Sequence, residues 1–127
     1  MKGERHVFVV DDDPSVRIGI ARLLRVASYD VHVFSNANDF LASLKPGLFG
    51  CLILDVRMPG MSIEELIDKI HTMCKAIPII VISADDDKEV RKMAQKINAV
   101  GFFRKPVDGT ALLDAVRWAL RVDKMNG

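Results

Sequence analysis

Cysteine is scarce in this chain of 127 residues, which contains only Cys51 and Cys74. The two lie far apart in the sequence, so they form neither a CxxC motif nor the ligand spacing of a zinc site. Both fall on apolar segments, where a small buried thiol in a reducing cytosol is the simplest interpretation. The sequence therefore indicates neither a disulfide framework nor a cysteine metal centre.

Charge of one sign is also lacking, because 18 Lys and Arg residues face 17 Asp and Glu residues, for a net charge of +1. Without a basic excess there is no electrostatic footprint for nucleic acid, and we expect no direct binding to it. No apolar run approaches the ~18 residues that span a bilayer. Residues 1–6 lack the apolar core of a signal peptide. We expect a cytoplasmic protein that does not contact a membrane.

The composition is that of an ordinary globular domain, with 50% hydrophobic and 28% charged residues. No repeat or low-complexity segment divides the chain, and its length suits one domain with a substantial core. We expect a single domain over residues 1–127, with its core at about 6–121 and a C-terminal tail at 122–127.

Short apolar runs separated by helical patterns organise the rest of the chain. The runs lack alternating polarity, as expected of strands covered by helices on both faces. Strict alternation of strand and helix requires right-handed crossovers and a parallel sheet. The predicted class is α/β, a doubly wound parallel sheet of five strands with five helices on both faces. The predicted strands are 7–10, 31–34, 51–54, 79–82 and 100–103.

Local signals mark where the helices begin and end. Asp13 before Pro14 predicts a capped helix start. Residues 62–65 have the Ser-x-x-Glu pattern of a capping box. The acidic run 85–87 is best explained as another helix cap, and Asn98 suits the left-handed end of that helix.

Polar side chains follow four of the predicted strands at the point where each ends. Asp11 and Asp12 follow the first strand, Asp55 the third, Ser83 the fourth and Lys105 the fifth. Because the carboxyl ends of parallel strands share one edge of a sheet, we expect these side chains to meet in a crevice where ligands bind.

Three neighbouring carboxylates repel one another, so such a cluster needs cations. Lys105 supplies one positive charge, and a divalent ion with oxygen ligands would balance the remainder. We therefore predict a Mg²⁺ site with open coordination positions. A carboxylate beside Mg²⁺ can accept a phosphoryl group as an acyl phosphate, whose oxygens Lys105 and the Ser83 hydroxyl would hold.

Four motifs then occur in register over about residues 6–121. They are Asp11-Asp12, the block 54–61, Ser83-Ala84 and the segment 102–106. In these the chain resembles the receiver domain of bacterial two-component response regulators. The resemblance implies a flavodoxin-like sheet with strand order 2-1-3-4-5.

The resemblance also implies roles for the acidic residues. Asp55 would accept a phosphoryl group from a histidine kinase or phosphotransfer protein. Mg²⁺ would be bound by Asp12, Asp55 and the backbone carbonyl of Arg57, with Asp11 contributing mainly through water. The domain would be a signalling switch rather than an enzyme that turns over a substrate.

Switching residues are implied in the same way. Ser83 and Lys105 would contact the phosphoryl group, and Phe102 matches the aromatic residue that moves inward on activation. The resemblance, and the need to turn Lys105 toward Asp55, predict a cis bond before Pro106. The altered surface would be the fourth helix, fifth strand and fifth helix, which could mediate homodimerisation or docking of an effector, either a C-terminal domain outside this chain or a separate protein. Its basic residues and its tryptophan are Arg91, Lys92, Arg104, Arg117 and Trp118.

Other interpretations remain beside this one. A degenerate receiver would bind partners without phosphorylation, but it would lack one of the acids or the lysine. A haloacid-dehalogenase-like phosphatase needs a second acid two residues after the nucleophile, where this chain has Arg57. A flavodoxin proper would need a phosphate-cradling loop after the first strand, where this chain has acids. One departure from the family is Ile63, which stands where receivers usually have glycine.

The histidines complete the inventory of possible ligands. His6, His32 and His71 show no metal-binding spacing in the sequence, so we expect them to be surface or packing residues.

Overall fold

The computed structural model describes residues 6–47, 50–58, 60–73, 77–85 and 88–126, with side chains described as far as Arg121. Strands and helices alternate along the whole of this length. In order they are β1 (His6–Val10), α1 (Pro14–Val26), β2 (Asp30–Phe34), α2 (Ala37–Ser43), β3 (Cys51–Asp55), α3 (Ile63–Met73), β4 (Ile79–Ser83), α4 (Lys88–Lys96), β5 (Gly101–Arg104) and α5 (Gly109–Asn126).

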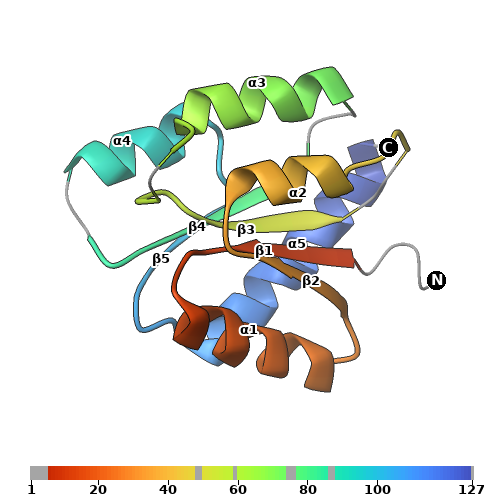
Figure 1. Ribbon diagram of the computed structural model, residues 1–127. Helices are drawn as coiled ribbons and strands as arrows, with labels where there is room; N and C mark the ends of the chain where they lie inside the picture. Colours follow the sequence, from red (N-terminus) through yellow and green to blue (C-terminus); the bar gives the residue numbers. More distant parts are fainter. Residues whose placement is uncertain (1–5, 48–49, 59, 74–76, 86–87, 127) are drawn as a thin grey trace.

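The strands form one parallel sheet in the order β2-β1-β3-β4-β5, which confirms the predicted topology. Helices α1 and α5 lie on one face of the sheet, and α2, α3 and α4 lie on the other (Figure 1). The first strand lies inside the sheet between β2 and β3, and the chain reverses its direction of winding between these two strands. Ligand sites of such sheets lie at the carboxyl ends of the strands, beside this reversal.

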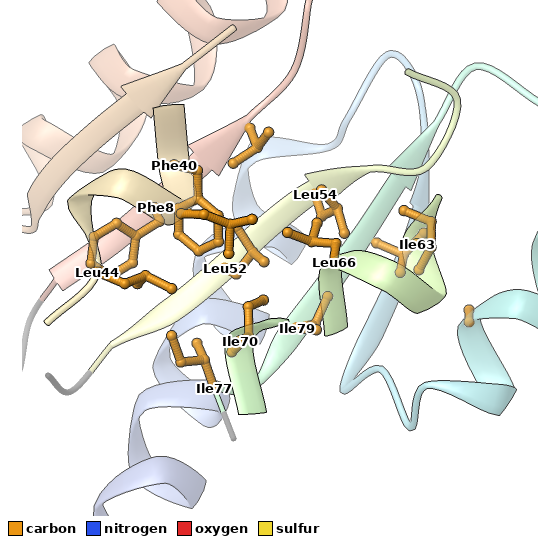
Figure 2. Close-up of a cluster of buried hydrophobic side chains, with 14 residues drawn as sticks. Phe8, Phe40, Leu44, Leu52, Leu54, Ile63, Leu66, Ile70, Ile77 and Ile79 are labelled. Carbon is orange, nitrogen blue, oxygen red and sulfur yellow. The ribbon is translucent and has the colours of Figure 1, made fainter. Parts of the chain in front are cut away.

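Two apolar layers hold the helices against the sheet. Successive side chains of a strand point to opposite faces, so Val7 and Val9 pack toward α1 and α5, whereas Phe8 and Val10 pack toward α2 and α3. Figure 2 shows the second layer, where Phe8 meets the fully buried Phe40 edge to face at 5.6 Å between ring centroids. Aromatic pairs of this geometry prefer such an offset arrangement.

Side-chain caps begin several helices, and those at Asp13 and Ser62 are as the sequence predicts. Each cap satisfies a backbone N–H that has no partner inside its helix. The acceptor oxygens and their donors are Asp13 and Ser15 N–H at 2.9 Å, Asn36 and Asp39 N–H at 2.8 Å, Ser62 and Glu65 N–H at 3.1 Å, and Asp108 and Ala111 N–H at 3.1 Å.

Helices α1 and α4 end in the same way. Ser28 and Asn98 have positive φ angles of 71° and 56°. Beside them, the Tyr29 N–H donates to the Leu24 carbonyl at 3.1 Å, and Ala99 bonds back in the same six-residue pattern at 2.9 Å. These are Schellman ends, which satisfy the last carbonyls of a helix. The prediction for Asn98 is thereby confirmed.

Some boundaries differ from the sequence prediction. Strand β5 pairs with β4 from Gly101 to Arg104, one residue later than expected, although the Val100 N–H already bonds to the Ile79 carbonyl at 2.8 Å. Helix α5 continues to Asn126, so residues 122–126 are helical rather than a tail. The reason is that no proline or glycine interrupts the sequence before Gly127.

Three further expectations can be compared with the fold. The bond between Lys105 and Pro106 is cis, as predicted. Cys51 is buried, while Cys74 lies outside the described residues. Ile63 is only 8% exposed and joins the core beneath α3, so the residue that replaces the usual glycine packs as an ordinary core side chain.

None of the helices in the described segments is both long and apolar enough to cross a membrane.

Candidate functional site

The sheet brings the predicted acidic residues together at its carboxyl edge. Asp11 follows β1 directly and Asp55 ends β3, its neighbour in the sheet. Asp12 lies beside Asp11, and oxygen atoms of the three carboxylates lie within 4.8 Å of one another. Two of the three are buried, since Asp11 is 0% and Asp55 4% exposed, whereas Asp12 is open to solvent. One side of the cluster is therefore accessible to a ligand.

Asp55 has its two oxygens held by different groups. Its Oδ1 accepts a hydrogen bond from the Arg57 N–H at 2.9 Å, which comes from the turn after β3. Its Oδ2 accepts one from Lys105 Nζ at 3.1 Å. A carboxylate fixed at both oxygens presents a defined direction to an incoming electrophile.

Lys105 approaches the acids from the segment that follows the edge strand β5. Its backbone N–H donates to the Ser83 carbonyl at 2.8 Å, which fixes the segment after β5 against the end of β4. From there Nζ lies 2.8 Å from Asp11 Oδ2 and 3.1 Å from Asp55 Oδ2. Burial alone would lower the pKa of Lys105, but its contacts with the two carboxylates outweigh burial and raise that pKa. The ammonium is thus the internal counter-ion of the cluster.

Asp11 is the most enclosed of the acids. Its Oδ1 accepts a hydrogen bond from the Asp13 N–H at 2.9 Å, and its backbone carbonyl accepts one from Arg17 at 2.8 Å. Burial raises the pKa of Asp11, and the charge on Asp55 raises it further, while the contacts with Lys105 and Asp13 act in the opposite direction. The Arg17 contact was not predicted, because a residue six positions into a helix gives no sequence signal for a bond back to the strand.

The acidic cluster fits a hard divalent cation. Asp11 Oδ2 is buried and contacts Lys105 only as an ion pair, with no well-directed hydrogen bond from the described part of the chain. Asp12 adds an exposed carboxylate, and all the side-chain donors are oxygen atoms, which Mg²⁺ prefers. A buried acceptor without a hydrogen-bond donor, at the centre of three carboxylates, is suited to a cation or to its bound water.

Ser83 and Asp85 form the wall of the site at β4. Ser83 is fully buried, and its Oγ accepts a hydrogen bond from the Asp85 N–H at 3.1 Å. The Asp85 carboxylate lies 3.2 Å from Arg57 Nε. Asp85 is therefore part of a turn and an ion pair beside the site, and the other two acids of the predicted cap, residues 86–87, lie outside the described residues.

Phe102 lies one strand away from Ser83, on the surface of β5. It pairs with Val81 of β4, packs against the apolar layer of α3 and α4, and is only partly buried. The guanidinium carbon of Arg91 lies 5.2 Å from the centre of its ring, within the range of a cation–π contact. The ring thus borders solvent between α4 and β5.

Comparison with known proteins agrees with this geometry. The family model described as "Response regulator receiver domain" matches residues 7–117. The transcriptional regulatory protein FixJ of Bradyrhizobium diazoefficiens is 35% identical over 122 residues, covering 95% of this chain and 59% of that protein. The response regulator protein TodT of Pseudomonas putida strain F1 is 39% identical over 116 residues, covering 91% of this chain and 51% of that protein.

A solved structure gives the same result. The response regulator StyR matches with a TM-score of 0.85 at 43% identity, covering 95% of this chain and 61% of that one. The chain therefore spans between about half and three-fifths of the length of these relatives. The match covers the strands and helices that build the acidic edge, and the chain belongs to the family of response regulator receiver domains.

Proposed function

We propose that this domain is a phosphoacceptor switch, in which Asp55 takes a phosphoryl group from a phosphohistidine of a histidine kinase or phosphotransfer protein. The observation that carries the proposal is the placement of a buried Asp55 carboxylate between Lys105 Nζ and the acids after β1. Phosphoryl transfer depends mainly on positioning and on neutralising charge, and this arrangement offers both.

The transfer is a displacement at phosphorus. One carboxylate oxygen of Asp55 forms the new P–O bond while the P–N bond to the donor imidazole breaks. The electron pair of that bond stays on the imidazole nitrogen, which is then protonated from solvent. The product is an acyl phosphate on Asp55 and a neutral histidine on the donor. A Mg²⁺ ion held by Asp12, Asp55 and the Arg57 carbonyl, with Asp11 acting through water, would supply positive charge to the phosphoryl oxygens.

The residues around Asp55 would then respond to the added charge. Phosphorylation replaces one negative charge with roughly two and adds acceptor oxygens. Lys105 already contacts Asp55, and its ammonium would then contact the phosphoryl oxygens. Ser83 would rotate its hydroxyl toward the same oxygens, exchanging its present hydrogen bond from the Asp85 N–H. The space left beside β5 would be filled by Phe102, moving inward from its position under Arg91.

Movement of Phe102 would alter the output face formed by α4, β5 and α5. This face carries exposed Arg91, Lys92 and Arg104, and Trp118 is 53% exposed. Basic side chains around an exposed tryptophan suit an acidic or self-complementary partner surface. The partner would be a second copy of the domain, an effector domain outside this chain or a separate protein.

The degenerate alternative is not favoured, because no acid and no lysine of the site is missing. Catalysis with turnover is not proposed either. The position two residues after Asp55 is Arg57, whose guanidinium is paired with Asp85 and cannot act as the general acid of a phosphatase.

Acetyl phosphate with Mg²⁺ tests the proposal directly. Intact-mass measurement should show one added phosphoryl group on the wild-type chain and none on Asp55→Asn under the same conditions. Asp68→Asn is the matched control, because this carboxylate is exposed on α3 and belongs to a helix outside the site. Equal labelling of Asp55→Asn, or loss of labelling in Asp68→Asn, would contradict the assignment.

A further inference from the structure

A second group of potential metal ligands lies toward the amino ends of the strands, whereas Asp55 lies at the carboxyl ends. His6 begins β1, while Asp30 and His32 lie on the neighbouring edge strand β2. In the parallel register His6 is directly opposite Asp30, and Phe8 is opposite His32. The sequence shows no metal-binding spacing because the two histidines are 26 positions apart. Pairing of the strands brings all three side chains to one face.

The ring nitrogens and carboxylate oxygens of these three residues have nearly the spacing of metal ligands. His6 Nδ1 lies 3.1 Å from His32 Nε2 and 3.3 Å from Asp30 Oδ2, and His32 Nε2 lies 3.6 Å from Asp30 Oδ1. A tetrahedral ion with bonds of about 2.0–2.2 Å to nitrogen and oxygen has ligands roughly 3.3–3.6 Å apart. Each of these contacts is therefore close to one ligand–ligand edge of such a tetrahedron, with the two histidines contacting different oxygens of Asp30.

Packing orders the His32 imidazole and the backbone of His6. The His32 ring stacks on Phe8 at 5.2 Å between centroids, and Phe8 is fixed in turn by Phe40. Behind His6, a Cβ added at Gly50 would lie 2.6 Å from the His6 carbonyl oxygen, so the chain there approaches β1 as closely as glycine permits. The two histidines are thereby partly preorganised, which lowers the entropy cost of binding.

The same contacts also have a role without metal. His6 Nδ1 and His32 Nε2 can share one proton, and Asp30 can offset the positive charge of a protonated imidazole. An ion would replace that proton, since both nitrogens must offer a lone pair to a metal. Metal binding and histidine protonation are thus competing events at one place.

We propose that His6 Nδ1, His32 Nε2 and an Asp30 carboxylate oxygen bind a divalent transition-metal ion, with Zn²⁺ as the probe and water at the fourth position. Imidazole ligands favour Zn²⁺, Cu²⁺ or Ni²⁺ over Mg²⁺, which prefers oxygen. The site is separate from the acidic cluster, because the five residues of β1 span roughly 15 Å between the two edges. The ion would fasten the edge strand β2 to its neighbour β1.

Calorimetric titration of the chelator-stripped protein with Zn²⁺, in excess Mg²⁺, tests the site. We expect one Zn²⁺ per chain, and at least about tenfold weaker binding in His32→Gln and in Asp30→Asn, since even indirect supporting residues cost that much when removed. The matched control is His71→Gln, an exposed histidine on α3, which should bind as the wild type does. Affinity should fall in acid, because protons compete with the metal ion for the imidazole nitrogens.

Three results would overturn the proposal: no Zn²⁺ binding by the wild type, unchanged binding in both His32→Gln and Asp30→Asn, or binding lost in Asp55→Asn but kept in His32→Gln. The last would place the ion in the acidic cluster. Because His32 packs on Phe8, the exposed Asp30→Asn variant tests the site independently of any packing defect, and thermal melting without metal establishes that both variants are folded. Phosphorylation of Asp55 is not involved in any of these measurements, so the two proposals stand or fail separately.

Discussion

Asp11 carries a negative charge although it is fully buried. Burial of this charge lowers the free energy of unfolding by an amount that varies with pH. Because the pKa of Asp11 is raised from its ordinary value of 3.8, the folded chain binds that proton more tightly than the unfolded chain does. The free energy of unfolding therefore falls as the pH rises from about 4 through the raised pKa. The raised pKa of Lys105 has the same sign at higher pH: its charge stabilises the fold below its ordinary pKa of 10.5, and this contribution is lost as the pH rises through the raised pKa.

Replacing Asp11 by asparagine should therefore stabilise the metal-free protein at neutral pH. The variant removes a buried charge and its repulsion with Asp55, while Lys105 keeps one carboxylate partner. We expect a gain on the order of 0.5–2 kcal/mol, the usual size for relief of such a conflict. Urea unfolding with a chelator at pH 7, and again near pH 4 where the difference should shrink, measures it. A loss of stability at pH 7 would show that Asp11 stabilises the fold.

Bound Mg²⁺ should reverse this order of stability, so that the wild type becomes more stable than Asp11→Asn. The ion neutralises the same carboxylates, so it should raise the thermal midpoint of the wild type by mass action and do so less for Asp12→Ala. The gain should decline at acid pH, because the ligands must be ionised. Thermal melting across a Mg²⁺ series tests this, with Asp68→Ala on α3 as the control. Equal Mg²⁺ stabilisation of Asp12→Ala would remove Asp12 from the ligand set.

At the scale of elements, the two Schellman ends provide a matched pair. Ser28 and Asn98 both have left-handed backbone angles, which cost most residues ~1–2 kcal/mol but are better tolerated by asparagine. Ser28→Gly should therefore stabilise the protein by about 0.5–1 kcal/mol after the added freedom of the unfolded chain is deducted. Asn98→Gly should change stability by less than about 0.5 kcal/mol. Denaturant midpoints compare the two, and equal gains would contradict this explanation.

Sequence patterns were sufficient for most of the elements and for the acidic edge. Apolar runs such as Cys51–Asp55 are strands buried on both faces, and their carboxyl ends must converge in a parallel sheet, so the meeting of Asp11, Asp55 and Lys105 followed from order along the chain. The C-terminal tail expected at 122–127 is instead helical as far as Asn126, because no proline or glycine interrupts α5 before Gly127.

Contacts that depend on the register between strands could not be predicted from sequence patterns. The approach of His6 to His32 requires two strands to pair with a particular alignment, which no local pattern of either strand specifies. The bond from Arg17 to the Asp11 carbonyl likewise depends on how α1 is oriented after its first turn. Both are tertiary facts, visible only once the elements are placed.

For the whole molecule, the single tryptophan is a convenient reporter of switching. Trp118 lies on α5, one turn after Ala115, which packs near Gly101 of β5. If phosphorylation alters this face, beryllofluoride with Mg²⁺ should change the fluorescence of Trp118, and Ser83→Ala should reduce that change while still allowing Asp55 to be labelled. By reciprocity, a partner that prefers the altered face must also favour the beryllofluoride form.

The same samples contain the control. Asp55→Asn should give no fluorescence response to beryllofluoride, which separates effects at the site from effects of the salt. Amide NMR shifts give an independent measure of how far the change extends. Shifts confined to the loops around Asp55, with Phe102 and α5 unaffected, would exclude the proposed coupling.

The strand order also determines when the charges of the site can meet as the chain leaves the ribosome. Strand β1 gains β2 on one side early, but its other side stays unpaired until β3 has been made. Asp11 and Asp55 then become neighbours while Lys105, fifty positions after Asp55, has yet to be synthesised. A nascent domain of four strands therefore contains the repulsion without its counter-ion. Arrival of β5 completes the sheet, and Lys105 directly after it brings the ammonium that pairs with Asp11 and Asp55, so the last strand adds an electrostatic contribution as well as packing.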